Sequence, residues 1–184
     1  MEKLKVLKFP ILLLLLFISC KQPRAKSEWT MTSDKTTWPD TDYLHPPQTP
    51  FDTNNYVIQL QNMPSFYGKP GEFGYILEGN NYGFDSLSFI LTNTQPKYGP
   101  RVHVHDHEEA HILLEGEVLY YVGGKEFSAK GPYVTRVPAG VPHTFINTGN
   151  KPFHLIGAFP RKHIVDKDVG PNPFIKDTSA KNNH

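Results

Sequence analysis

Short apolar runs rich in Val, Ile, Tyr, Phe and Thr recur along the chain, and turn-forming residues separate them. β-branched and aromatic residues favour strands, whereas Gly, Pro, Asn and Asp interrupt them. Between residues 51 and 159 no run has the length and 3.6-residue period of a helix. The pattern therefore predicts an all-β fold, a sandwich, jelly roll or barrel. The expected strands are 55–61, 74–78, 86–92, 101–105, 111–122, 126–129, 133–137, 144–147 and 153–159.

Polar segments flank these runs on both sides. Residues 20–50 are rich in Thr, Ser, Pro, Lys and Asp and lack apolar periodicity, which is typical of a flexible tether. Residues 164–184 are similarly polar and are expected to form a C-terminal tail. A single β-barrel domain is therefore expected over residues 51–163.

The first twenty residues have the pattern of an export signal. Lys3, Lys5 and Lys8 precede a short apolar run over residues 11–18, which Ser19 and Cys20 follow directly. The four residues Phe17-Ile18-Ser19-Cys20 resemble the bacterial lipoprotein cleavage box. The resemblance implies that residues 1–19 are a lipoprotein signal peptide and that acylated Cys20 anchors the protein in the cell envelope, at the periplasmic face or outer membrane. The alternative is an ordinary signal peptide with an incidental cysteine.

Charge and cysteine content exclude several classes of function. The net charge is +1. Because the leader carries three Lys and one Glu, the remaining chain has no basic excess with which to bind nucleic acid. Cys20 is the one cysteine of the chain, so a disulfide framework, a thiolate metal site and a cysteine nucleophile are not expected.

Three histidines and one glutamate have the spacing of a metal site. His103 and His105 lie two residues apart on a predicted strand, so their side chains point to the same face. Glu109 begins the next apolar run after a charged turn, and His143 follows the turn at Pro138-Ala139-Gly140. Imidazole nitrogens and a carboxylate are suitable ligands for a divalent transition metal. The other interpretation places the two histidines on a surface strand and leaves Glu109 as a solvated charge.

Two motifs in this region resemble the signature motifs of the cupin superfamily. H-x-H-x3-E-x6-G is matched by His103, His105, Glu109 and Gly116, and P-x-G-x2-H-x3-N is matched by Pro138, Gly140, His143 and Asn147. The resemblance implies a double-stranded β-helix, which is a small jelly-roll barrel. It also implies that His103, His105, Glu109 and His143 are the metal ligands. The chain departs from the family pattern at Lys97, where the family has glycine, and in having six residues instead of five between Gly131 and Pro138.

The neighbouring histidines have different expected roles. His111 shares strand parity with Glu109 and is expected to point into the pocket, as a hydrogen-bond donor to the site or as a catalytic proton carrier. His107 lies between two acidic residues and is expected in a solvated loop. His154, within the last predicted strand, is interpreted as structural.

These features favour a metal-dependent enzyme that acts on a small organic molecule. The ligand types do not distinguish Fe, Mn, Ni, Cu, Co and Zn. By resemblance, a dioxygenase-like reaction on an enolic or phenolic substrate is expected, and Phe89, Tyr120 and Phe145 are expected to line the barrel. The alternatives are a non-redox isomerase or decarboxylase, a non-catalytic cupin that binds a small molecule or sugar, and a structural envelope protein. Because family members often dimerise, a homodimer is also compatible with the resemblance.

Overall fold

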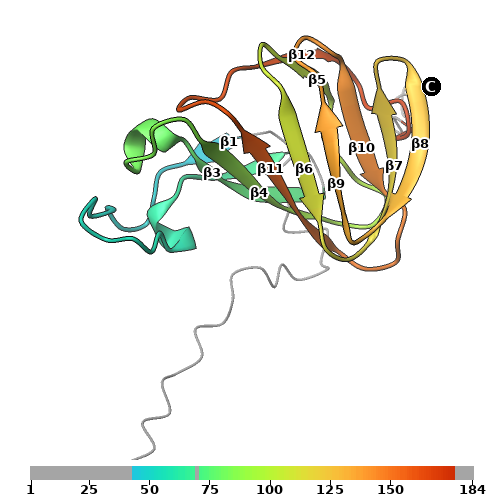
Figure 1. Cartoon of the computed structure of the whole chain (residues 1–184). Helices are drawn as coiled ribbons and strands as arrows, with labels where there is room; N and C mark the ends of the chain where they lie inside the picture. Colours follow the sequence, from blue (N-terminus) through green and yellow to red (C-terminus); the bar gives the residue numbers. More distant parts are fainter. Residues whose placement is uncertain (1–42, 69–70, 177–184) are drawn as a thin grey trace, which may run out of the picture. The chain divides into compact units, whose positions relative to one another are not determined.

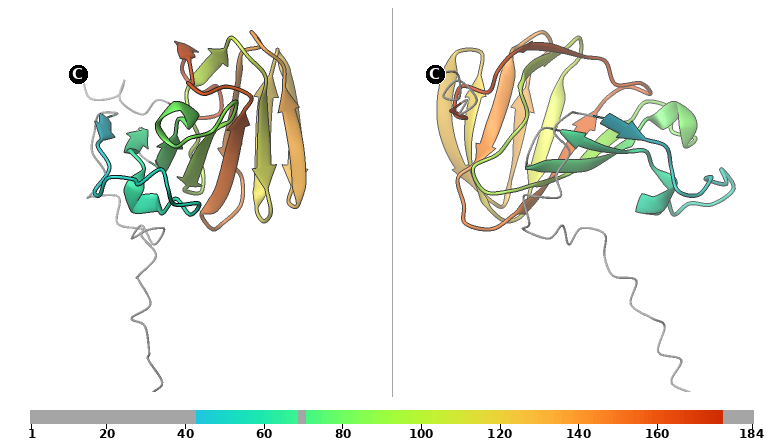
Figure 2. Two further views of the ribbon diagram at one scale, coloured as in Figure 1. Left: turned by 60° about the vertical axis from the view of Figure 1, so that its left-hand side comes forward. Right: turned by 180° about the vertical axis from the view of Figure 1, so that it is seen from behind.

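The computed structural model describes residues 43–68 and 71–176, and these form two antiparallel β-sheets that lie against each other as layers (Figures 1 and 2). The seven-stranded sheet has the order β1 (Tyr43–His45), β2 (Ser65–Gly68), β3 (Glu72–Leu77), β4 (Ser88–Thr94), β11 (Phe153–Phe159), β6 (Glu109–Leu113) and β9 (Tyr133–Val137). The five-stranded sheet has the order β12 (Asp166–Gly170), β5 (Val102–His105), β10 (His143–Asn147), β7 (Glu117–Val122) and β8 (Lys125–Lys130).

The only helical elements in the described residues are two short 3-10 turns, Leu60–Asn62 and Gly79–Asn81. The predicted all-β class, a jelly-roll arrangement of two sheets, is therefore confirmed. No helix within the described ranges is long and apolar enough to cross a membrane. The expected signal peptide and lipidated Cys20 lie outside the described residues, as does most of the expected tether.

Most predicted strands are found, and two are correct to the residue, β9 and β11. The run 111–122 was expected as one strand, but the structure divides it into β6 and β7 at Gly116, whose φ of 122° suits glycine. The predicted strand 55–61 is wrong, because this segment is a largely exposed loop that ends in the first 3-10 turn. Lys97, at the position where the family motif has glycine, has a φ of 70°, which lies in the left-handed region that glycine adopts most readily.

The sheets extend beyond the expected domain limits of 51–163. β1 pairs with β2 at one end, and β12 pairs with β5 at the other. Asn172, which follows β12, is buried and donates hydrogen bonds to the carbonyl groups of Pro100 and Phe145. β12 has the sequence Asp-Lys-Asp-Val-Gly and is mostly exposed, as suits an edge strand. Because neither of its faces is buried, it lacks the apolar alternation by which a strand is recognised in a sequence.

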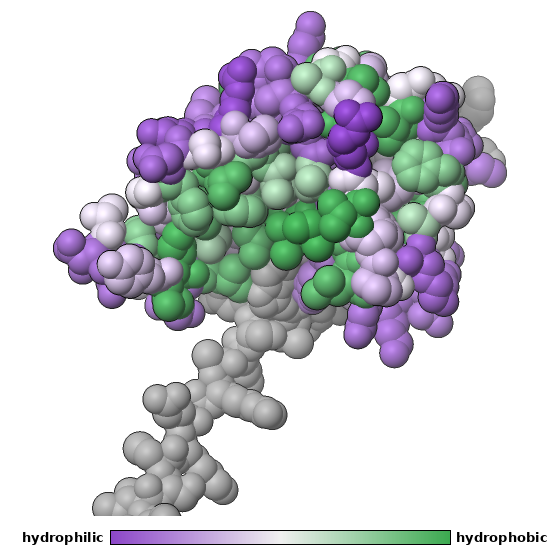
Figure 3. All heavy atoms as spheres, in the orientation of Figure 1, coloured by the Kyte–Doolittle hydropathy of each residue, from purple (hydrophilic) through white to green (hydrophobic). Residues whose placement is uncertain are grey.

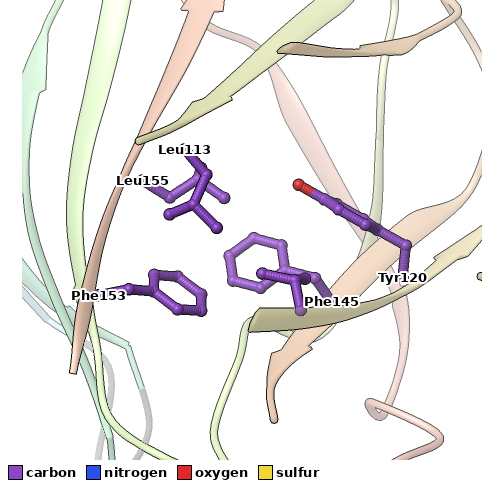
Figure 4. Close-up of a cluster of buried hydrophobic side chains, with 6 residues drawn as sticks. Leu113, Tyr120, Phe145, Phe153 and Leu155 are labelled. Atoms are coloured by element: carbon purple, nitrogen blue, oxygen red, sulfur yellow. The ribbon is translucent and has the colours of Figure 1, made fainter. Parts of the chain in front are cut away.

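The hydrophobic core includes side chains of both sheets. Its buried members point toward one another (Figure 4) and are Leu113, Val118, Tyr120, Phe145, Phe153 and Leu155. On the outer surface of the seven-stranded sheet, apolar side chains gather over the centre of the face shown in Figure 3. Val134, on β9, and Leu114 are among the exposed apolar residues of the described chain.

Leu113 and its neighbour Leu114 provide a direct test of this core. Leu113 is 0% exposed, whereas Leu114 is 67% exposed. We expect Leu113→Ala to lower the free energy of unfolding by about 2–5 kcal/mol, because it leaves a cavity among packed side chains. Leu114→Ala should change it by less than about 0.5 kcal/mol. Urea denaturation measures both values, and equal losses for the two variants would contradict the assignment of the core.

Candidate metal centre

The two sheets bring four potential metal ligands together between them. His103 and His105 lie on β5, and His143 lies directly opposite His103 on the neighbouring strand β10. Glu109 comes from β6 in the other sheet. One ligand atom from each of these residues lies within 4.8 Å of all the others. The histidines and the glutamate expected from the sequence to form a site therefore do converge.

Each of these three imidazole rings is held by a backbone carbonyl at its Nδ1 atom. Nδ1 of His103 lies 2.8 Å from the carbonyl oxygen of Arg101, and that of His143 lies 2.9 Å from Val141. Nδ1 of His105 lies 2.9 Å from the carbonyl oxygen of Val165. A carbonyl oxygen accepts hydrogen bonds and cannot donate them, so each Nδ1 carries a proton, and Nε2 of a neutral ring presents a lone pair. This arrangement orients a ligand histidine toward a metal ion.

Glu109 supplies the carboxylate of the site and is 5% exposed. Its Oε2 atom lies 2.9 Å from Nε2 of His143 and 3.4 Å from Nε2 of His105. Its Oε1 atom lies 2.9 Å from Nε2 of His111. Burial raises the pKa of Glu109, but the charge of His111 and the hydrogen bonds from the surrounding histidines outweigh it and hold that pKa well below its usual value. The carboxylate is therefore ionised at neutral pH.

The histidine pKa values depend on burial and on the neighbouring charges. Burial, together with the charge of His143, lowers the pKa of His103 to about 4, so this ring is neutral at neutral pH. Burial also disfavours the charged form of His105, yet the Glu109 carboxylate 3.4 Å from its Nε2 and the carbonyl of Val165 at its Nδ1 outweigh burial and raise the pKa of His105. The two adjacent rings are therefore shifted in opposite directions, because burial dominates at His103 and the Glu109 carboxylate dominates at His105.

The donor set fits a single divalent metal ion. Nε2 of His105 is buried and has no hydrogen-bond partner among the described residues, although its Nδ1 atom is satisfied. A bound ion would satisfy this atom, and it would separate the Glu109 carboxylate from the imidazole nitrogens that now face it. Three imidazole nitrogens and one carboxylate oxygen suit several transition metals, so the donor set leaves the identity of the ion open.

Three of the four ligands line a pocket of about 520 Å³ between the sheets. His103, His105 and Glu109 are among its lining residues, as are His111 and Phe145. Its walls also include the apolar side chains of Ile76, Ile90 and Leu155. A ligand of this pocket would therefore contact both the metal centre and an apolar surface.

Two of the three aromatic residues expected to line the barrel lie inside it. Tyr120 is buried in the core, and Phe145 is buried there and also lines the pocket. Phe89 is the exception: Ile90 and Thr92 on β4 line the pocket, so the period of two places Phe89 on the opposite face, where its ring packs against Phe84.

His111 points toward the site, as its strand parity predicted, and it connects Glu109 to two tyrosines. Its Nδ1 atom lies 3.2 Å from the hydroxyl group of Tyr120, which lies 3.1 Å from that of Tyr133. When Tyr120 donates to Nδ1, Nε2 of His111 carries the proton and donates it to Oε1 of Glu109. Sequence reasoning found His111 but missed its connection to the two tyrosines, because they come from other strands.

His107 corrects another prediction. It was expected in a solvated loop, but it is 7% exposed and its ring stacks on His105, with ring centroids 5.4 Å apart and an interplanar angle of 7°. The ring of Phe159 packs edge-on against it. The alternation that places His103 and His105 on one face continues past the end of β5, so the side chain of His107 also points inward. The prediction of a solvated loop was wrong because it relied on the acidic residues on either side of His107.

Gly157 is a further residue of the site that sequence reasoning missed. It lies on β11 directly opposite His111, and a Cβ atom placed there would lie 2.6 Å from Oε1 of Glu109. This glycine therefore provides the space that the carboxylate occupies. A glycine inside a strand often marks such a close approach, which is the signal that could have identified it.

Comparison with known proteins agrees with this geometry. The family model of the cupin domain matches residues 91–159, which include all four ligands. Residues 91–159 form a cupin domain. No curated protein matches the chain.

Solved structures similar to this one include oxalate decarboxylase from Bacillus subtilis at pH 4.6, with 21% sequence identity and a TM-score of 0.51. A second, from work on the Mn(II) centres of the same enzyme, has 22% identity and a TM-score of 0.50. Each alignment covers 54% of this chain and 28% of the other, so this chain matches less than a third of the length of those proteins. At this identity the likeness shows the fold.

The role of the four residues is tested by removing one of them. We expect the cupin domain to bind about one divalent ion per chain. His143→Ala should weaken the binding of this ion by more than about 100-fold, because loss of a residue that only supports a ligand already weakens metal binding by about 10–100-fold. His154→Ala, an exposed histidine on β11, is the matched control and should bind normally. Calorimetric titration with Zn(II) measures this, and an unchanged affinity in His143→Ala would contradict the assignment.

Proposed function

We propose that this chain is a metal-dependent enzyme of the dioxygenase type that acts on a small enolic or phenolic molecule. The supporting observation is the convergence of three oriented imidazoles and one ionised carboxylate on the pocket of about 520 Å³. A redox-active divalent ion held there supplies Lewis acidity toward an enolate or phenolate oxygen, together with one-electron chemistry. The organic substrate enters between the two sheets.

The protein residues set the charge and the polarity of the site. Three neutral imidazoles and the Glu109 carboxylate leave a local charge of +1 around a divalent ion, which favours an anionic oxygen ligand. The apolar walls at Ile90, Phe145 and Leu155 displace water beside that charge, and a lower local polarity strengthens electrostatic interactions.

His111 is proposed to position Glu109 and to keep a proton beside it. Its Nε2–H donates to Oε1, which leaves Oε2 facing the Nε2 atoms of His105 and His143. Tyr120 in turn holds Nδ1, so the ring cannot rotate without losing two hydrogen bonds. A buried histidine on the pocket wall can also pass this proton to a substrate oxygen.

A non-redox decarboxylation is the second candidate, because the solved structures similar to this one include oxalate decarboxylase. The size of the pocket argues against a substrate as small as oxalate, since about 520 Å³ is within the range of pockets that hold drug-sized ligands. The two reactions differ in whether dioxygen is consumed, and a non-catalytic cupin would show neither.

The test is an oxygen-electrode assay of protein loaded separately with iron, copper, nickel, manganese or zinc, with enolic and phenolic compounds as substrates. We expect a redox-active metal to support dioxygen consumption matched by loss of the organic compound. His111→Phe should lower turnover about 10–100-fold, as does loss of an outer-shell partner, and His111→Gln should recover part of it by donating to Glu109. His154→Ala should have no effect.

Other outcomes of this assay select the alternatives. Release of carbon dioxide without oxygen uptake would replace the dioxygenase proposal with a decarboxylase. Stoichiometric metal binding with no turnover of any compound would indicate a binding protein, and in that case His111→Phe should leave ligand affinity nearly unchanged.

We also propose that the protein is exported and anchored through acylated Cys20. The support is the basic start at Lys3, Lys5 and Lys8, followed by a short apolar run and Ser19-Cys20. Growth with a labelled fatty acid should label the full chain and the Ser19→Ala control, which keeps a small residue before the cysteine. Cys20→Ser should remain unlabelled, and labelling that persists in Cys20→Ser would contradict lipidation at this residue.

A further inference from the structure

Two isoleucines on the inner face of the seven-stranded sheet point into the pocket but are not fully buried. Ile76 on β3 and Ile90 on β4 are directly opposite each other and both line the pocket. Ile76 is the one residue of β3 that is not buried, and Ile90 is likewise only partly buried. An apolar side chain that points inward usually packs in the core, so this pair leaves apolar surface open to the pocket. The cupin family match begins at residue 91 and includes neither residue.

The strand register places this pair beside the metal centre. Gly157 on β11 lies opposite Ile90 on one side and opposite His111 on the other. A Cβ atom at Gly157 would lie 2.6 Å from Oε1 of Glu109. Because Cβ atoms of directly opposite residues lie about 4.5–5.5 Å apart, Cβ of Ile90 lies within about 8 Å of this carboxylate oxygen. Ile76 follows one interstrand step of about 4.8 Å further along the same row.

The neighbouring surfaces of the pocket are also apolar. The ring of Phe66 on β2 lies 2.5 Å from where a Cβ atom of Gly74 would be, two residues before Ile76. Thr92, opposite Gly74, donates its hydroxyl hydrogen to the carbonyl oxygen of Leu155 at 3.3 Å. A polar substituent placed here would exchange its hydrogen bonds with water for contacts with carbon, whereas an aliphatic substituent is stabilised by burial.

Of the charged residues that line the pocket, none is adjacent to the isoleucine pair within its sheet. Asp166 and Asp168 lie on β12 of the other sheet, and Asp168 forms an ion pair with Arg101. Glu72 lies on β3 but four residues from Ile76. The row that leads away from the metal centre across β11, β4 and β3 is therefore apolar.

We propose that the pocket selects a phenolic or enolic compound whose substituent is aliphatic and uncharged. The oxygen end of the compound meets the metal centre, its ring lies beside Glu109, and its substituent packs on Ile90 and Ile76. The two isoleucines are then specificity residues for the substituent. This assignment rests on the proposed function, because the metal centre sets the orientation of the oxygen end.

A series of catechols that differ only in the substituent at ring position 4 tests this proposal. It comprises catechol, 4-methylcatechol, 4-ethylcatechol and 3,4-dihydroxybenzyl alcohol, whose hydroxymethyl group is similar in size to ethyl. Calorimetry with the full-length protein loaded with Zn(II), at pH 7, measures binding without oxidation. We expect each added carbon to tighten binding about fourfold, as the burial of a methylene group does. The benzyl alcohol should bind no more tightly than catechol.

The variants separate the role of the isoleucines from a general effect on the protein. Ile90→Thr should reduce the advantage of 4-ethylcatechol over catechol to within about threefold and leave the affinity for catechol unchanged. Ile76→Thr should act in the same direction. Leu91→Thr is the matched control, because Leu91 is the next residue of β4, is also partly buried and points to the opposite face. It should keep the full advantage. The four affinities of the unmodified protein test the proposal even if the variants at Ile90 fold poorly.

The outcomes distinguish this proposal from the proposed function. Equal binding of the four catechols, or tightest binding of the benzyl alcohol, would overturn the selection of an aliphatic substituent and leave the metal centre intact. An advantage of 4-ethylcatechol that survives in both Ile90→Thr and Ile76→Thr would overturn the role of these residues. Failure of all four compounds to bind the loaded protein would overturn both proposals.

Discussion

The burial of the Glu109 carboxylate is the constraint on which the site depends. An ionised carboxylate between two sheets is unfavourable unless positive or hydrogen-bonding groups surround it. Here the Nε2 atoms of His105, His111 and His143 all lie within 3.4 Å of its oxygens. The backbone carbonyls that hold the Nδ1 atoms of the ligand histidines fix where these nitrogens point, so the main chain determines the geometry of the site.

The antiparallel topology explains how distant residues supply one site. β5 and β10 are neighbours in one sheet, which places His103 opposite His143 although they lie 40 residues apart. β6 faces them from the other sheet, with β11 beside it, and Gly157 on β11 leaves room for the carboxylate. Ile90 on β4 lies opposite the same glycine, so the scaffold that builds the metal centre also places an apolar surface beside it.

The metal centre could be predicted from the sequence because its ligands lie in two short segments whose residue spacing can be read directly. Strand parity relates His103 to His105 and Glu109 to His111, and the two motifs add His143. The features that the sequence analysis missed depend on contacts between different strands, as with the hydrogen bond between Tyr120 and His111 and the space at Gly157. The sequence analysis also missed two polar edge strands. β1 and β12 each pair with one neighbour and carry no apolar alternation, so their residues were assigned to the tether and to the C-terminal tail. His107 shows the reverse error, since acidic neighbours suggested solvent where the ring is buried.

The most direct test of the central claim is anomalous diffraction from crystals of the protein grown with Zn(II). The account predicts one strong peak between the sheets, about 2.1 Å from the Nε2 atoms of His103, His105 and His143 and at a similar distance from one oxygen of Glu109. The three Nδ1 atoms should keep their carbonyl partners. A peak at another place, or an ion bound through Nδ1 with those carbonyl contacts broken, would contradict it.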